Sequence, residues 1–485
     1  MIRSFSLQFH RFCRKQFPSP RPFSAAPIAI FLASALILPV PLAAQGESLR
    51  PAPPAISLAQ PTQTNEGGPP ATITLQDALD RAKKNSAEYL SAVTDAQVAR
   101  EDRVQAKAAL LPSFNSLTQY LGTQGNGILP SGRYVTNDGV HVYREWVVAH
   151  EEINAGTFLR TGYKRASAAE AVAKAKAEIA LRGLNVTVTK SYYDLIVSQR
   201  KYATAQQALQ QAQHFLDITR DQENHGQAAH SDVVKADLQF QQQKQAFDEA
   251  ELAMEQARLN LAVLVFPALN QNFTAVDDLD SSHVLPQLSE VQQMAEKQNP
   301  DLRVAMESLR QAEMDVTSAK TAFLPTLAID TDYGIEANHF ALKSRVAANP
   351  DEGRLPNLGY FITAGISFPV WDWGALRSKL HQAQFKKTQA AVELSQAQRQ
   401  MVSKLYSYYN EALVAHSAIE TLRHAADLAA ESLRLTNLRY QAGESTALEV
   451  VDAENALTQA RNAYDDAQAR YRLALATLQT LTGTF

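Results

Sequence analysis

The stretch that decides the fold is residues 450–481, VVDAENALTQARNAYDDAQARYRLALATLQTL. Large apolar side chains recur there every seven residues, and a second series, three positions further on, is mostly alanine. The first series is Val450, Leu457, Tyr464, Tyr471 and Leu478, and the second is Ala453, Ala460, Ala467, Ala474 and Leu481. These two series are the positions at which paired helices would contact each other. Large residues in one series and alanine in the other predict closely packed helices in a left-handed coiled coil.

The same pattern occurs 217 residues earlier in the chain. Its two series are Val233, Phe240, Phe247, Met254 and Leu261, and Ala236, Gln243, Ala250, Ala257 and Leu264. Another match, at an offset of 213, pairs Leu75–Tyr120 with Leu288–Tyr333. A repeat of this length indicates duplication of one structural unit. We therefore predict a first unit over residues 73–287 and a second over 288–485.

Each unit is expected to contain helix, strand, loop, strand and then two long helices. The longer helices are predicted over about 156–220 and 374–438, and Gly183 could interrupt the first. Pro112 and Pro325 end the helices that precede the strands. The strands are predicted at about 113–123, 143–153, 326–336 and 358–368.

The predicted strands have two different faces. In the second unit Leu327, Ile329, Thr331, Tyr333 and Ile335 alternate with smaller or polar residues, and Tyr360, Ile362, Ala364, Ile366 and Phe368 alternate with a set that includes Thr363. The first unit is less regular, because Glu145, His150, Glu151 and Glu152 are unfavourable in lipid. Strands of about 11 residues with this alternation are typical of outer-membrane barrels, although a soluble sheet of two hairpins is the alternative. Since lipid does not tolerate open sheet edges, a membrane version with four strands per chain must be an oligomer.

The N-terminal region predicts export from the cytoplasm. A basic stretch to Arg21, an apolar run over 25–38 and the pair Ala43-Ala44 predict a secretory signal peptide over 1–44, with an N-terminal membrane anchor as the alternative. Residues 45–72 hold six prolines among small polar residues, which predicts a flexible extension. The only cysteine is Cys13, so the mature chain should have neither disulfides nor a cysteine metal site.

Charge and residue pattern exclude several classes of function. Residues 1–44 hold five of the 46 basic residues and no acid, which leaves 41 basic against 50 acidic residues and a charge of −9. This sign argues against a nucleic-acid partner. No nucleophile and base stand together, so we expect neither an enzyme nor a cofactor. The close pairs His225 with His230 and His416 with His424 lack further ligands, so solvated helix positions are favoured over a metal site.

The order of these features resembles the TolC-like outer-membrane efflux protein family over about residues 73–485. The resemblance rests on the duplication, on the Phe368-Pro369-Val370-Trp371-Asp372-Trp373-Gly374 junction, and on turns at Gly226 and Gly443 followed by Ser231-Asp232-Val233 and Leu448-Glu449-Val450-Val451-Asp452-Ala453. The first-unit junction, Ile153-Asn154-Ala155-Gly156, lacks the Pro and Asp of the family pattern. The resemblance implies a mainly α-helical homotrimer whose 12 strands form one outer-membrane barrel, continued by a periplasmic helical tunnel.

The resemblance also assigns the candidate site. Asp232, Tyr440, Glu449 and Asp452 match positions that close or line the periplasmic entrance, and Gly226 and Gly443 match helix tips that face an adaptor. Ordinary charges on a solvated helix are the alternative. Glu449 and Asp452 are three residues apart, so both carboxylates can share one helix face. Ser445 stands where the family has a basic residue, so an ion-pair latch to Asp232 is not expected, whereas a Tyr440–Asp232 hydrogen bond is.

The sequence thus predicts a passive outer-membrane channel of a tripartite efflux or secretion system. Its partners would be outer-membrane lipid, a periplasmic adaptor (membrane fusion) protein and an inner-membrane transporter that selects the substrate. A soluble secreted coiled-coil scaffold or adaptor is the alternative from another class.

Overall fold

The computed structural model describes residues 71–122, 141–267, 272–281, 283–337, 339–349 and 353–483. The expected signal peptide and the extension as far as residue 70 lie outside these ranges. The last two residues of that extension lie inside a strand, because β1 (Ala71–Ile73) pairs in parallel with β4 (Phe273–Ala275). The predicted boundary at residue 72 is therefore too late.

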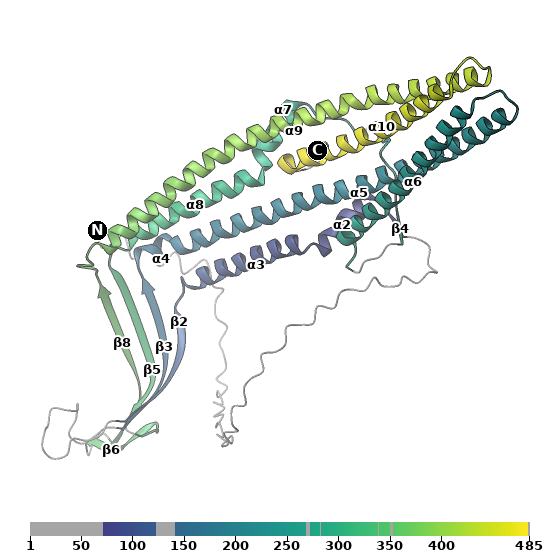
Figure 1. Cartoon of the computed structure of the whole chain (residues 1–485). Helices are drawn as coiled ribbons and strands as arrows, with labels where there is room; N and C mark the ends of the chain where they lie inside the picture. The colour runs from purple at the N-terminus through teal and green to yellow at the C-terminus, as the bar shows by residue number, and fades with distance from the viewer. Residues whose placement is uncertain are drawn as a thin grey trace, which may run out of the picture. The chain divides into compact units, whose positions relative to one another are not determined.

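Four strands form one antiparallel sheet (Figure 1). They are β2 (Ser113–Gly122), β3 (His141–Ile153), β5 (Thr326–Ala337) and β8 (Leu358–Ser367), in the spatial order β2-β3-β5-β8. Their ends differ from the predicted ranges by at most two residues. The short strands β6 (Lys343–Asn349) and β7 (Gly353–Pro356) pair with each other. In the described part of the chain, β2 and β8 each have one unpaired edge.

The strand register separates an apolar face from a charged face. Ile329 lies opposite Ala364, and Leu327 lies opposite Ile366, so the apolar sides of β5 and β8 coincide. On the other face Arg144 Nη2 lies 2.9 Å from Glu336 Oε1, and His150 Nδ1 lies 2.6 Å from Asp330 Oδ1. These two ion pairs between β3 and β5 thus lie on the face opposite the apolar one.

The four β3 residues expected to disfavour lipid divide between these two faces. His150 and Glu152 belong to the charged face, because they pair with Asp330 and Ala328. Glu145 and Glu151 belong to the apolar face. Glu145 there accepts hydrogen bonds from the hydroxyls of Ser116 and Thr118 on β2. A carboxylate that accepts two hydrogen bonds is less costly to remove from water than a free one.

The helices repeat in the two halves of the chain. The first half has α2 (Leu75–Asn85), α3 (Ala87–Ala108), α4 (Ala155–Leu159), α5 (Thr161–Asn224) and α6 (His230–Val265), and the second has α7 (Leu288–Gln298), α8 (Pro300–Thr321), α9 (Ala375–Gln441) and α10 (Ala447–Thr482). Helix α5 contacts α3, α6, α8 and α10, whereas α9 contacts α8 and α10. Helices α3 and α6 therefore lie at one border of the helical layer and α9 lies at the other (Figure 1). None of the helices in the described ranges combines the length and apolarity that a membrane crossing requires.

The heptad seam of α10 is buried. Val450 and Leu478 are fully buried, and Leu457, Tyr471 and Ala474 are nearly so. The predicted first long helix, in contrast, has its break in a different place. Arg160, with φ 55°, separates α4 from α5, whereas α5 continues through Gly183. The expected interruption at Gly183 is thus wrong, because one glycine inside a long packed helix lowers its stability by only about 1 kcal/mol.

Candidate functional site at the helix turns

Both long helical hairpins turn in the same way. Gly226 and Gly443 have φ of 71° and 78°, the left-handed region that glycine adopts without strain. The residue after each glycine donates its N–H to a carbonyl five residues back, as Gln227 does to Gln222 and Glu444 to Arg439. This bonding ends a helix and satisfies its last carbonyls. The two turns lie side by side in Figure 1, so the chain presents two glycine-centred tips together.

Glu449 is turned back onto the start of α10. Its carboxylate accepts hydrogen bonds from Ser445 Oγ at 2.9 Å and from the Thr446 backbone N–H at 3.3 Å, and it lies 3.6 Å from Arg439 Nη1. The Ser445 hydroxyl, followed by the Thr446 N–H, lowers the pKa of Glu449. Glu449 therefore completes a capping box with Thr446 in this chain. Asp452, three residues on, is exposed, and its carboxylate has no hydrogen bond or ion pair with any other described residue.

Tyr440 joins the two halves of the chain. Its hydroxyl donates to Gln222 Oε1 at 3.0 Å and lies 3.4 Å from Thr219 Oγ1, both on α5. The expected hydrogen bond from Tyr440 to Asp232 is not formed, and that prediction is wrong for this structure. Asp232 lies in the first turn of α6, and its Oδ1 is 3.6 Å from Lys235 Nζ.

An apolar cluster lies beneath the two tips. It contains Phe215, Leu216, Ala236, Ala447 and Val450, with Val233, Phe240, Tyr440 and Val451 packed against it. The rings of Phe215 and Tyr440 are 5.2 Å apart. Burial of this cluster holds the tips of the two hairpins together within one chain.

Sequence reasoning missed two residues at this site. One is Gln222, the actual partner of Tyr440, and nothing local in the sequence indicates it. The other is Glu454, which is 8% exposed on α10 and whose carboxylate has no ion pair or hydrogen bond in the described part of the chain. Burial raises the pKa of Glu454 to about 7. The sequence held one signal for the burial of Glu454. This residue directly follows Ala453, which belongs to the heptad series, and a residue next to that series borders the coiled-coil interface.

The histidine pair at the first tip stabilises the turn. His225 Nδ1 lies 2.6 Å from the Asp221 carbonyl oxygen, and His230 Nδ1 lies 2.8 Å from Glu223 Oε1. Neither contact brings a third ligand, and no group of three or more potential metal ligands occurs among the described residues. These contacts account for both histidines as parts of the turn.

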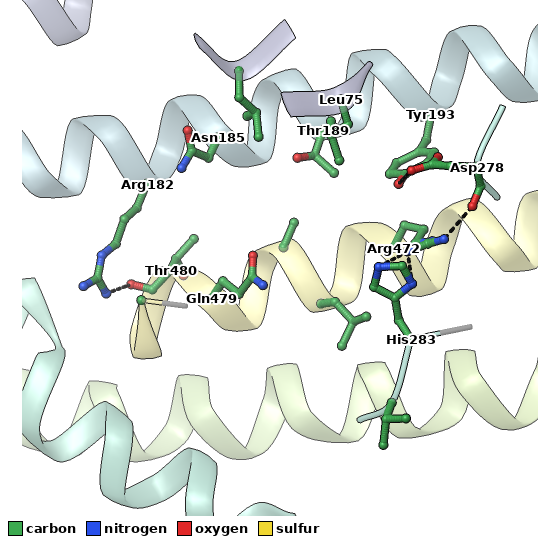
Figure 2. A pocket seen from close by; sticks show the side chains of 15 residues that line it. Leu75, Arg182, Asn185, Thr189, Tyr193, Asp278, His283, Arg472, Gln479 and Thr480 are labelled. Atoms are coloured by element: carbon green, nitrogen blue, oxygen red, sulfur yellow. Dashed lines mark hydrogen bonds between the residues drawn. The ribbon is translucent and has the colours of Figure 1, made fainter. Parts of the chain in front are cut away.

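A pocket in the helical layer lies where the two repeats join (Figure 2). Its volume is about 350 Å³, and its walls come mainly from α5 and α10. The guanidinium of Arg472 donates to the carbonyls of Asp278 and Ser281, and Arg182 donates to the carbonyls of Thr480 and Gln298. Both arginines are thus engaged in fixing the connecting segment and the helix ends. The pocket therefore belongs to the structural connection between the two repeats and is not a candidate ligand site.

Arg200 fixes the same connecting segment from α5. It forms ion pairs with Asp277 at 2.6 Å, Asp280 at 2.8 Å and Asp465 of α10 at 3.0 Å. Tyr192, fully buried, donates its hydroxyl to the carbonyl of Val276 at 2.7 Å. The two repeats are therefore connected by directed polar contacts as well as by apolar packing.

Comparison with known proteins shows what the chain resembles. Residues 291–484 match the family model described as outer membrane efflux protein. The chain is 24% identical to the outer membrane protein TolC of Vibrio cholerae serotype O1 over 421 residues, 84% of this chain and 90% of that protein. It is also 24% identical to the pyoverdine export outer membrane protein OpmQ of Pseudomonas aeruginosa over 423 residues, 85% of this chain and 84% of that protein. The open state of the MtrE outer membrane channel of Neisseria gonorrhoeae matches with a TM-score of 0.71 at 22% identity, covering 84% of this chain and 89% of that one.

Proposed function

We propose that this chain, which is a TolC-like outer-membrane efflux protein, assembles as three copies into one closed channel that an adaptor opens at its helix tips. The protein is an outer-membrane channel of an efflux system, with its helical part in the periplasm. The matched proteins are channels, so they do not support the alternative of a soluble secreted coiled-coil scaffold or adaptor. In the proposed assembly three four-stranded sheets close into a 12-stranded barrel.

The observation that carries the proposal is the pair of open edges on the sheet. β2 and β8 each present an unpaired row of backbone groups in the described part of the chain. An edge of this kind cannot remain unsatisfied in hydrocarbon. Pairing β8 of one copy with β2 of the next satisfies both edges with a single repeated contact, and such a head-to-tail contact closes into a ring.

The distribution of exposed apolar residues in the helical layer supports the same contact. Exposed large apolar residues are frequent on the border helices and absent from α5 in the middle. Those on α9 include Val392, Leu413, Val414, Leu428, Leu435 and Leu438, and those on α3 and α6 include Leu90, Val98, Val104, Val234, Leu238 and Leu252. Apolar surface at both borders of the layer suits contact between α9 of one copy and α3 and α6 of the next.

We infer that the helix tips form the regulated entrance. In this proposal Tyr440 and Asp232 belong to the gate, and Asp452 contributes one carboxylate per copy to the lumen. Glu449 contributes a second carboxylate, although its capping bonds hold it closer to the backbone. The tips at Gly226 and Gly443 would receive the periplasmic adaptor, which competes with the contacts under them. The inner-membrane transporter would supply both the energy and the choice of substrate.

The proposed cargo is small molecules, metal ions or proteins that the inner-membrane transporter selects, and the channel is proposed to be passive, without catalytic chemistry. OpmQ is named for pyoverdine export, but an identity of 24% does not transfer that substrate to this chain. The charged sheet face, with Arg144, His150, Asp330 and Glu336, would line the barrel interior and suit a hydrated path.

Reconstitution into planar bilayers tests the channel. Purified protein should insert and give discrete conductance steps of one unit size, small while the tips are closed. Truncating both hairpins below the tips should increase the unit conductance. Absence of any discrete steps from protein that remains folded would contradict the proposal.

A further inference from the structure

Helix α3 packs against its own chain mainly through one side. Its long contact is with α5, and on that side the guanidinium of Arg103 pairs with Glu170. No residue of α3 is buried, and Leu90 and Val98, on the opposite side, are exposed. Helix α3 therefore presents a free apolar row at one border of the helical layer (Figure 1).

The half of α9 next to the sheet presents a similar row at the other border. Ala383 and Ala390 are buried on the side toward α8, where Lys387 Nζ lies 2.9 Å from Glu313 Oε1. Phe385 and Val392 lie on the opposite side and are 71% and 61% exposed. In one chain these two apolar rows are at opposite borders, so they can cover each other only between copies.

The two rows are in register when both helices are counted from the sheet. Helix α3 leads into β2, and α9 follows β8. Val98 lies ten residues before the last residue of α3, and Phe385 lies ten residues after the first residue of α9. Leu90 and Val392 lie 18 and 17 residues from the same ends. If β8 of one copy pairs with β2 of the next, Val98 meets Phe385 and Leu90 meets Val392.

A charged row flanks each apolar row. Asp95 and Asp102 are seven residues apart on α3, and Lys379 and Lys386 are seven residues apart on α9. At about 100° per residue, each charged row is rotated by about 100° from its apolar row, and in the same sense along the chain. Helix α3 runs toward the sheet and α9 runs away from it, so the two are antiparallel. Rows rotated in the same sense on antiparallel helices lie on the same side of the contact.

These two charged rows are complementary and free. All four side chains are exposed, and none has an ion pair or hydrogen bond with another described residue. Asp102 lies six residues from the end of α3, and Lys379 lies four residues from the start of α9. For Asp95 and Lys386 these separations are 13 and 11 residues. The offset of two residues is about 3 Å along the axis, which a lysine side chain can span.

We propose that α9 of one copy packs antiparallel on α3 of the next, with Lys379 paired to Asp102 and Lys386 paired to Asp95 across the contact. The inference rests on the proposed assembly of three copies and adds to it the residues by which one copy recognises another. One copy supplies the lysines and the next supplies the carboxylates, as a head-to-tail contact requires. The series stops at two pairs, because the next residues in the two rows are Glu88 and Glu393.

Cysteine cross-linking tests the register. Val98→Cys and Phe385→Cys are introduced together in a chain whose only cysteine, Cys13, is replaced by serine. Oxidation should link most chains into covalent trimers on a non-reducing gel, since a disulfide forms where Cα atoms are about 4.4 to 6.8 Å apart. Val98→Cys with Val392→Cys is the matched control. Its cysteines are one heptad out of register, about 10 Å along the axis, and should stay unlinked.

The outcomes separate this inference from the proposed assembly. Light scattering first gives the number of copies in each purified variant. Trimers in which only the control pair cross-links would overturn the proposed register. Trimers in which neither pair cross-links would show that α3 and α9 do not meet, and the inference would fail while the trimer stands. Monomers would contradict the proposed assembly itself, and this inference would fall with it.

Charge exchange tests the ion pairs separately. Lys379→Glu with Lys386→Glu would place only carboxylates on this side of the contact, so the trimer in detergent should dissociate at a temperature several degrees lower. Adding Asp95→Lys and Asp102→Lys should restore the temperature of the parent, because the charges are again opposite. Lys176→Glu, at an exposed position on the middle helix α5, should leave it unchanged. A fourfold variant that is no more stable than the double variant would contradict the ion pairs.

Discussion

Tyr440 of α9 donates a hydrogen bond to Gln222 of α5, and 3.0 Å separate the two side-chain oxygens. These residues are 218 positions apart and lie in different repeats. The bond connects the last turn of one long helix to the last turn of the other, directly below the two glycine tips. It is therefore one of the directed contacts that the proposed adaptor would have to weaken to move one hairpin away from the other.

Removing this contact should loosen the entrance. Tyr440→Phe and Gln222→Ala should each raise the unit conductance of closed channels in planar bilayers, since each loses one hydrogen bond worth about 1 kcal/mol. The double variant should add little to either single change, because both remove the same bond. Asp232→Asn is the matched control, because Asp232 contacts Lys235 rather than Tyr440. A larger effect from Asp232→Asn than from Gln222→Ala would contradict this assignment.

Glu454 should make the helix tips sensitive to pH. Its pKa in the folded chain is about 7, above the ordinary value of 4.5, so the folded state favours the protonated form. This group's contribution to stability is fully present below about pH 4.5 and is lost as the pH rises through about 7. At about 1.4 kcal/mol per pKa unit, its loss amounts to about 3 kcal/mol per chain.

Thermal unfolding between pH 5 and pH 8 measures this effect. The parent should lose more stability than Glu454→Gln over this range, and the two should differ most at pH 8. Asp452→Asn should retain the dependence of the parent, because Asp452 is exposed. Identical pH profiles for the parent and Glu454→Gln would assign the dependence to other groups.

Asp452 and Glu449, the two carboxylates near the second tip, should differ in their influence on ion selectivity. Asp452→Ala should reduce cation preference and block by multivalent cations, since a ring of exposed charges in a narrow opening concentrates counter-ions. Glu449→Gln should change selectivity less and weaken the start of α10, because Glu449 caps that helix. Reversal potentials under a salt gradient measure the first effect. If Asp452→Ala leaves selectivity unchanged, Asp452 is an ordinary solvated charge.

The two faces of the sheet should tolerate charge differently. Ile329→Arg or Ile366→Arg would place a guanidinium among lipid tails, which costs about 2 to 4 kcal/mol near the bilayer centre. Thr363→Arg lies opposite Asp330 on the charged face and should assemble normally, with altered conductance only. Assembly yield in outer membranes is the measurement. Equal yields at the three positions would mean that the assignment of the two faces is wrong.

Much of the fold could be predicted from the sequence because its signals are periodic and repeated. The heptads of α6 and α10 and the alternation in β5 are local patterns, and the duplication allowed the irregular strand β3 to be located from its better counterpart. The break at Arg160 could not be predicted, because no glycine or proline marks that position. In the first junction Asn154 performs the capping role that Asp372 has in the second, although its residue type differs.

The candidate site was less predictable, because its contacts join distant parts of the chain. The choice of Gln222 over Asp232 as the partner of Tyr440 depends on how two helices from different repeats are rotated against each other. The burial of Glu454 depends on the same packing. The capping role of Glu449 was available locally, since Thr446 three residues before a glutamate predicts a capping box.

The mass of the detergent-solubilised protein, measured by light scattering with the detergent contribution subtracted, tests the central claim most directly. Two open sheet edges and two apolar helix borders per chain predict a single closed species of three copies, with no folded monomer that inserts into bilayers. A stable monomer that remains soluble without detergent would contradict the account.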